Sequence, residues 1–197
     1  MSPVVYFDLE TGGIDPDSPV IQLAAVAIDQ CTWRELDSFE KKLLFDESLA
    51  DPEALALNHY DPDVWRKEAF QPQVALRDFA VFLNPYRSVE FVSKKTGNPY
   101  SVAKLAGHNA ANFDAPRLQR MYSSHGIFLG ADPRVRCTYQ LAMWWFDAHA
   151  LSPKSFKLGD LCEYFGLEGS GAHDALADVR MTVALARRLS DWAAPID

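Results

Sequence analysis

Two acidic residues at alternate positions near the N-terminus have the spacing for metal chemistry. Asp8 and Glu10 lie in the run Val4-Val5-Tyr6-Phe7-Asp8-Leu9-Glu10-Thr11-Gly12. Its apolar, β-branched start predicts a strand, and because side chains alternate along a strand, both carboxylates point to one face. Such a pair is costly on a buried face unless a cation neutralises it, and hard cations such as Mg²⁺ prefer oxygen ligands. The run therefore predicts half of a metal site, with exposed acids at an ordinary strand end as the alternative.

Three later residues extend this set. Asp114 opens a predicted helix, where an Asp also serves as a simple N-cap. Asp178 lies among apolar residues of the predicted last helix, so we expect it near the buried side. His173 precedes that helix and can lean over the same site. A strand pair, two helix acids and one His are the composition of a two-metal phosphoryl-transfer site with a general base.

The elements that must position these residues follow from hydrophobic periodicity and turn signals. We predict three strands in an antiparallel meander, then a β-hairpin, and then alternating strands and helices. Both Trp144 and Trp145 are expected to be core or packing residues. The predicted strands cover 4–11, 20–28 and 33–45, one ends near 109 and one covers 135–137; the predicted helices cover 51–57, 72–82, 114–126, 138–149, 156–165 and 174–192.

Length and composition indicate one globular domain over residues 1–197. The chain has 48% hydrophobic residues, enough for a core. Its formal net charge of −8 argues at first against a nucleic-acid partner, because such proteins usually carry basic patches. That objection weakens if acids are concentrated in a metal site, since two divalent ions would bring four positive charges there. Local charge is therefore the better guide.

Cysteine usage and hydropathy bear on localisation. Cys31, Cys137 and Cys162 are widely spaced without a CxxC pair. They predict buried thiols in a reducing, cytoplasmic compartment and no zinc site. No apolar run reaches the length of a membrane span, and the N-terminus lacks the order of a signal peptide, so no membrane association is expected.

The predicted hairpin near 89–104 has a basic tip. Lys94 and Lys95 lie there with Tyr100 beside them, and together they could contact a nucleic-acid backbone and stack on a base. Lysines that keep an edge strand soluble explain the same residues, and both interpretations stay open. The other cations that could guide a strand, each better explained singly as a solvated surface charge, are Lys104, Arg117, Arg120, Lys154 and Lys157.

Three segments resemble, in order, the exonuclease motifs of the DEDDh (DnaQ-like) family of 3′-to-5′ exonucleases. They are Phe7-Asp8-Leu9-Glu10-Thr11-Gly12, His108-Asn109-Ala110-Ala111-Asn112-Phe113-Asp114 and His173-Asp174-Ala175-Leu176-Ala177-Asp178. The resemblance spans nearly the whole chain. The second motif is one residue longer than in many members, a spacing that resembles the nuclease domain in the bacterial exonuclease I branch.

The resemblance implies an α/β, ribonuclease H-like fold with a mixed five-stranded sheet flanked by helices, in which the hairpin near 89–104 is an insertion. It also implies two divalent metal ions, Mg²⁺ or Mn²⁺, and a catalytic role for His173 in taking the proton from the attacking water. The implied catalytic metal ligands are Asp8, Glu10, Asp114 and Asp178, with Asp8 bridging both ions. The implied substrate-binding residues are Thr11, Gly12, His108, Asn109 and Phe113.

The implied activity is release of nucleoside 5′-monophosphates from the free 3′ end of a single-stranded nucleic acid, with DNA favoured over RNA. A 3′-to-5′ exoribonuclease is the alternative within the family. Alternatives from another class are a catalytically silent nucleic-acid-binding module and a subunit of a replication or repair complex. Homodimers are common in the family, so a homodimer is a further possible state.

Overall fold

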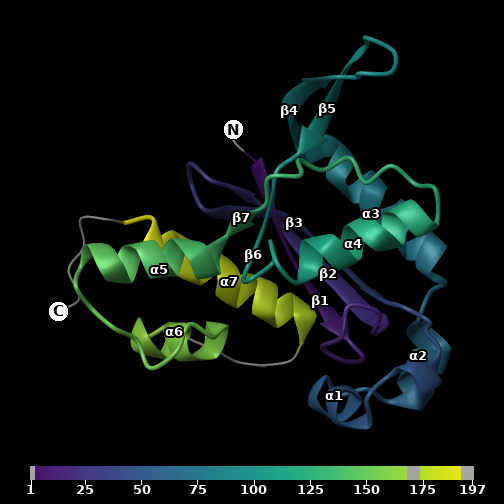
Figure 1. The fold of residues 1–197 in the computed structure, drawn as a ribbon, viewed down its shortest axis with the longest axis horizontal. Helices are drawn as coiled ribbons and strands as arrows, with labels where there is room; N and C mark the ends of the chain where they lie inside the picture. Colours follow the sequence, from purple (N-terminus) through teal and green to yellow (C-terminus); the bar gives the residue numbers. More distant parts are fainter. Residues whose placement is uncertain (1–2, 168–173, 192–197) are drawn as a thin grey trace.

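A mixed five-stranded sheet forms the centre of the fold (Figure 1). The computed structural model describes residues 3–167 and 174–191. The sheet order is β3-β2-β1-β6-β7; β1, β2 and β3 pair antiparallel, whereas β6 pairs parallel with both β1 and β7. The predicted mixed five-stranded sheet is thus confirmed. The strands are β1 (Pro3–Thr11), β2 (Val20–Asp29), β3 (Arg34–Lys42), β6 (Leu105–Gly107) and β7 (Arg136–Cys137).

Helices cover both faces of this sheet (Figure 1). The α-helices are α1 (Pro52–Leu57), α2 (Pro62–Glu68), α3 (Pro72–Leu83), α4 (Asp114–Ser124), α5 (Thr138–Ala148), α6 (Leu158–Tyr164) and α7 (Ala175–Leu189). Short 3₁₀ turns lie at Glu47–Leu49 and Asn84–Tyr86.

The alternation of β1 decides which helix faces the acids. Val5, Phe7 and Leu9 belong to a buried cluster with residues of α3 and α4. Val4 and Tyr6 lie in a second cluster with α7. Because Asp8 and Glu10 continue the Val4–Tyr6 series, their side chains lie on the α7 side of the sheet.

A third buried cluster joins α5, α6 and α7 and includes Trp145, Phe146 and Leu161. Trp145 is fully buried, as predicted, but the prediction for Trp144 was wrong because that side chain is 71% exposed. Neighbouring residues on a helix point in different directions, so only one tryptophan of the pair faces the cluster.

The remaining predictions have mixed outcomes. The hairpin is confirmed as a separate two-stranded sheet of β4 (Arg87–Val92) and β5 (Pro99–Ala103). Helix α2 was not predicted, although Asp61 caps its first N–H groups and Pro62 occupies its first position. Of the three cysteines, Cys137 and Cys162 are buried as expected but Cys31 is exposed, because it lies in the turn between β2 and β3. In the described part of the chain, no helix has the length and apolar character needed to span a bilayer.

Candidate active site

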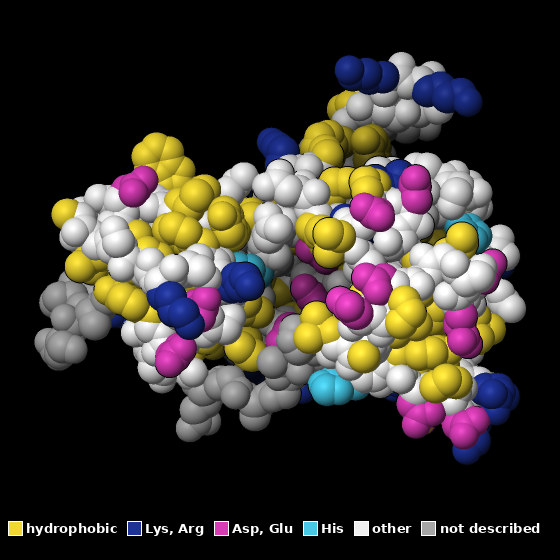
Figure 2. Space-filling model, turned by 60° about the horizontal axis from the view of Figure 1, so that its bottom comes forward, with side chains coloured by type: hydrophobic (Ala, Val, Ile, Leu, Met, Phe, Trp, Pro, Cys, Tyr) yellow, Lys and Arg dark blue, Asp and Glu magenta, His cyan; other side chains and the backbone are white. Residues whose placement is uncertain are grey.

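Three carboxylates meet where β1 and α7 pack together. Each of Asp8, Glu10 and Asp178 offers an oxygen, and these atoms lie within 4.8 Å of one another. Asp178 is in the first turn of α7, which packs across both β1 and β2. A contact between residues 10 and 178 of the chain therefore follows from the docking of one helix. Figure 2 shows acidic side chains gathered around a hollow on this face.

Asp114 joins the site from the opposite direction. It is the first residue of α4 and is buried, and its Oδ1 accepts a hydrogen bond of 3.2 Å from the backbone N–H of Leu9. Leu9 lies between Asp8 and Glu10 in β1. The simple capping role is not observed: Phe113 holds the N-cap position of α4, and no side chain caps that helix. The carboxylate instead fixes the helix start to the acidic strand.

Three carboxyl groups of the site have raised pKa values. Burial, followed by the charges of Asp114, Glu10 and Asp178, raises the pKa of Asp8 well above its ordinary value. Burial and neighbouring acids raise the pKa of Glu10 to about 7. Burial also raises that of Asp114 to about 7, although the hydrogen bond from Leu9 opposes the shift. Without a cation, these carboxyl groups therefore keep their protons to a higher pH than ordinary carboxyl groups do.

This donor set fits a divalent cation. Mg²⁺ and Mn²⁺ take carboxylate oxygens as ligands, and a bound cation would remove the like-charge repulsion that raises these pKa values. Asp174, just before α7, adds to the field because its charge also raises the pKa of Glu10.

The end of β1 is held tightly. Thr11 Oγ1 donates to the Gly13 carbonyl at 2.7 Å, and the buried Asn58 donates from Nδ2 to the Thr11 carbonyl at 2.9 Å. A Cβ at Gly12 would lie 2.7 Å from the Cβ of Ala50. Gly12 therefore has no room for a side chain, and these contacts fix the end of β1. Asn58 was not predicted, and its side chain gives no signal in the sequence.

His108 is bound within the protein through both ring nitrogens. Its Nε2 lies 2.9 Å from the Phe156 carbonyl, and its Nδ1 lies 2.9 Å from Thr138 Oγ1. A carbonyl only accepts, so Nε2 carries the proton, and in the neutral ring Thr138 donates to Nδ1. Burial lowers the pKa of His108, which favours this neutral form. The ring therefore joins β6 to α5 and to the loop before α6.

The rest of the second motif forms a turn closed by Arg117. Asn109 adopts a left-handed φ of 54°, and its carbonyl accepts from the N–H groups of Asn112 and Phe113. The Arg117 guanidinium lies 3.6 Å from the centroid of the half-buried Phe113 ring.

Arg117 and Arg120 do not act as free cations along a strand path. Arg117 is buried and donates to the carbonyls of Phe113, Ile14 and Asp15, whereas Arg120 donates to that of Pro16. Both guanidinium groups thus fix the loop after β1. His173, the expected general base, lies outside the described residues.

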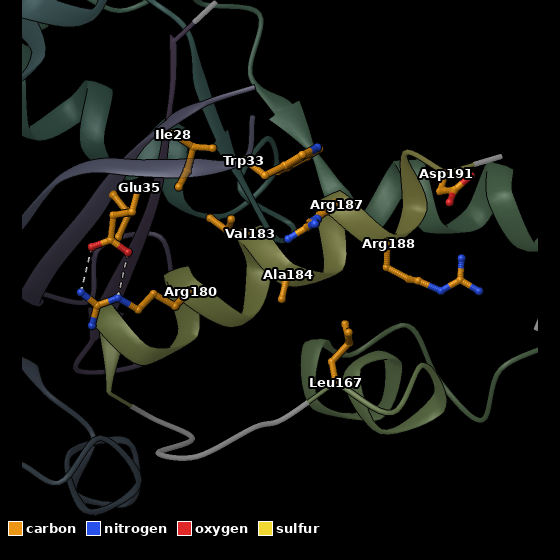
Figure 3. Close-up of a pocket in the computed structure, with 11 residues that line it drawn as sticks. Ile28, Trp33, Glu35, Leu167, Arg180, Val183, Ala184, Arg187, Arg188 and Asp191 are labelled. Carbon is orange, nitrogen blue, oxygen red and sulfur yellow. Dashed lines mark hydrogen bonds and ion pairs between the residues drawn. The ribbon is translucent and has the colours of Figure 1, made fainter. Parts of the chain in front are cut away.

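A separate cavity of about 620 Å³ opens between the β2–β3 edge of the sheet and the outer side of α7 (Figure 3). Trp33, Ile28 and Val183 line it, and Arg180 pairs with Glu35 at 3.0 Å on its rim. None of the four carboxylates lines this cavity. It is distinct from the acidic site.

Comparisons with known proteins define the class. Residues 100–186 match the sequence profile of the RNase_T family, described as exonuclease. The fold is shared with E. coli exonuclease I in complex with a dT13 oligonucleotide, at a TM-score of 0.73 and 20% identity over 96% of this chain and 41% of that chain. The complex of the same enzyme with a dA16 oligonucleotide has a TM-score of 0.72 and 21% identity, over 98% of this chain and 43% of that chain. Its zinc-bound complex with single-stranded DNA has a TM-score of 0.71 and 20% identity, over 97% of this chain and 42% of that chain. No curated protein sequence matches the chain significantly.

The fold is therefore ribonuclease H-like, as predicted. The exonuclease profile covers the second and third motifs and supports the predicted resemblance to DEDDh (DnaQ-like) exonucleases. The chain spans less than half the length of the solved exonuclease I structures that it matches.

Proposed function

We propose that residues 1–197 form a single metal-dependent 3′-to-5′ exonuclease domain that releases nucleoside 5′-monophosphates from single-stranded nucleic acid. One observation carries this proposal: Asp8, Glu10 and Asp178 place carboxylate oxygens within 4.8 Å of one another. Acids held this closely in a partly buried site destabilise a protein unless a cation compensates them. A structural role alone does not account for such a group.

The residues divide the work. Asp8, Glu10 and Asp178 would hold one divalent ion, and Asp8 with Asp114 would hold a second. Bound there, Mg²⁺ or Mn²⁺ would stabilise the charge that develops at the scissile phosphate. His173 would take the proton from the attacking water. Thr11, Gly12, Asn109 and Phe113 would contact the terminal nucleotide. His108 would hold the neighbouring Asn109 in place through its own bonds to Thr138 and Phe156.

DNA is the favoured substrate. The support is that E. coli exonuclease I has been solved with dT13 and dA16 oligonucleotides, and that its fold is shared over nearly all of this chain. The direct test compares hydrolysis of matched single-stranded DNA, single-stranded RNA and duplex ends in Mg²⁺ and in Mn²⁺. Faster hydrolysis of RNA would overturn the DNA preference and favour the exoribonuclease.

Two variants test the catalytic assignment. Asp8→Asn should abolish both hydrolysis and metal binding, because it removes a charge shared by both ion positions. His173→Ala should lose most activity yet keep metal binding, as measured by calorimetry. If wild type hydrolyses no strand while Asp8→Ala binds DNA as well as wild type, the chain is a silent nucleic-acid-binding module instead.

The oligomeric state is a separate proposal. A homodimer, or a subunit of a replication or repair complex, follows only from the family resemblance. Light scattering after size-exclusion chromatography tests the first, because a monomer across the micromolar range would contradict it.

A further inference from the structure

The β4–β5 hairpin is the part of the molecule whose charge opposes the rest. Residues 87–104 hold four cations and one acid, which gives a net charge of +3. Because the whole chain has a formal net charge of −8, the rest of it carries −11. In Figure 2 the hairpin projects from the body with basic side chains at its tip. A basic projection on an acidic protein is the electrostatic footprint expected for a polyanion.

The tip lysines are available to bind. Lys94 and Lys95 are exposed in the turn between β4 and β5. Among the described residues, neither ammonium group has an ion-pair or hydrogen-bond partner. Lys41, Lys42 and Lys154, by contrast, pair with acids. The two tip charges are therefore not used to hold the fold together.

An open aromatic surface lies beside these charges. Phe91 and Tyr100 are directly opposed across the hairpin and stack with ring centroids 5.9 Å apart. Phe128, which is 60% exposed, packs its edge against Tyr100 at 5.8 Å, and Tyr100 is itself 40% exposed. The Arg134 guanidinium lies 5.6 Å from the Phe91 ring. Exposed aromatic rings next to Lys and Arg are the combination that binds single-stranded nucleic acid through stacking and phosphate contacts.

We propose that this surface, formed by Lys94, Lys95, Tyr100 and Phe128, binds the single-stranded nucleic acid upstream of the end that enters the carboxylate site. This inference rests on the proposed function. Figure 1 places the hairpin beyond the end of the sheet where β1 begins, whereas Asp8 and Glu10 lie toward the end where β1 finishes. One strand must therefore extend along the molecule to reach both sites, so the hairpin contributes only with long substrates.

Affinity and hydrolysis measured separately test the proposal. Binding of labelled single-stranded DNA of about 4 and about 30 nucleotides is followed by fluorescence anisotropy in EDTA, where no hydrolysis occurs. Hydrolysis of the same strands is followed in Mg²⁺. The variants are Lys94→Glu/Lys95→Glu and Tyr100→Ala. The matched control is Arg34→Glu/Arg77→Glu, which makes the same charge change at exposed positions of β3 and α3.

For the long strand, Lys94→Glu/Lys95→Glu should weaken binding by roughly tenfold and make its logarithmic salt dependence shallower by about 1 to 1.5. Tyr100→Ala should cost about fivefold or more, as expected for one stacked base. Hydrolysis of the short strand should equal that of wild type. Circular dichroism verifies that each variant is folded.

Unchanged long-strand affinity in both hairpin variants would overturn the proposal, as would an equal loss in the control. A protein partner would then be the better explanation of the aromatic surface. Hairpin-dependent binding by a wild type that hydrolyses neither strand would support this surface while refuting the exonuclease. Hydrolysis by wild type, together with binding that does not depend on the hairpin, would support the exonuclease and refute this surface.

Discussion

The carboxylate of Asp114 accepts a hydrogen bond from the backbone N–H of Leu9, which joins the start of α4 to the strand that carries the other acids. This bond and the burial of Asp114 have opposite effects on its pKa, and burial prevails, so the pKa rises to about 7. Asp114 therefore holds β1 in place through its hydrogen bond, but its buried carboxylate destabilises the metal-free site when it is ionised.

Asp114→Asn should separate these two contributions. The amide oxygen still accepts from Leu9, but the charge is gone, so the metal-free protein at pH 8 should gain about 1 kcal/mol or more in unfolding free energy. Asp114→Ala also removes the acceptor and should be less stable than Asp114→Asn by about 1–3 kcal/mol. Both should lose nuclease activity. Urea unfolding gives the unfolding free energies of the three proteins. An Asp114→Asn protein less stable than wild type would contradict the expected ranking.

The metal-free protein should become less stable as pH rises. The pKa values of Glu10 and Asp114 are about 7 in the folded state, above their ordinary values near 4, so the folded state binds more protons between these limits. Stability then falls from about pH 4 to above pH 7. Melting temperatures in EDTA should show this decline, and Mg²⁺ should reverse much of it at pH 8.

As a control for that pH series, Asp8→Asn should show a shallower decline in EDTA and little response to Mg²⁺. An EDTA profile for wild type that is flat between pH 5 and 8 would contradict the mutual repulsion of these acids.

Replacing His108 should loosen the loop before α6. His108→Ala removes the hydrogen bond to the Phe156 carbonyl and one of the two bonds of the Thr138 hydroxyl, and such a loss costs about 1–3 kcal/mol. Hydrogen exchange should increase most around residues 154–157. His125→Ala is the matched control, because His125 is exposed and its ring bonds only locally, to Met121 and Ser124; it should cost less than about 0.5 kcal/mol. Equal effects of both substitutions would argue against this role.

Gly107 makes the close approach of β6 to β1 possible. A Cβ there would lie 2.8 Å from the Phe7 carbonyl oxygen and 2.6 Å from the Cβ of Ala110. Gly107→Ala should therefore destabilise the protein by about 1–3 kcal/mol, and by shifting Phe7 it should weaken Mn²⁺ binding at the adjacent Asp8. Gly159→Ala, in α6 with no atom within 4 Å of the added carbon, should be neutral or stabilising by up to about 1 kcal/mol. Calorimetry measures the Mn²⁺ affinity of both variants, and urea unfolding measures their stability. Equal results for Gly107→Ala and Gly159→Ala would contradict this role of Gly107.

Local patterns in the sequence were sufficient for the sheet and the acids of β1. Alternation put Asp8 and Glu10 on one face, and the apolar run of β2 gave a strand buried throughout. Helix α2 was missed although Asp61 and Pro62 repeat the start signal that identified α1 at Asp51 and Pro52. A helix of 7 residues offers too few turns for periodicity to show.

Contacts between distant segments could not be predicted. Leu9 and Asp114 are 105 residues apart, and His108 reaches Thr138 and Phe156 across 30 and 48 residues. These bonds depend on how helices dock on the sheet, which no local pattern encodes. The same limit explains why Arg117 was expected to be a surface cation rather than the donor that fixes the loop after β1.

The docking of α7 on β1 has a consequence for protein synthesis. The acids of β1 leave the ribosome first, but Asp178 follows only after nearly all of the chain, and pairings between such distant segments form late in folding. A nascent chain therefore exposes two acids without the third. Metal affinity should appear only once α7 has been translated and has packed against the sheet, so ribosome-bound intermediates would remain unable to bind the ion.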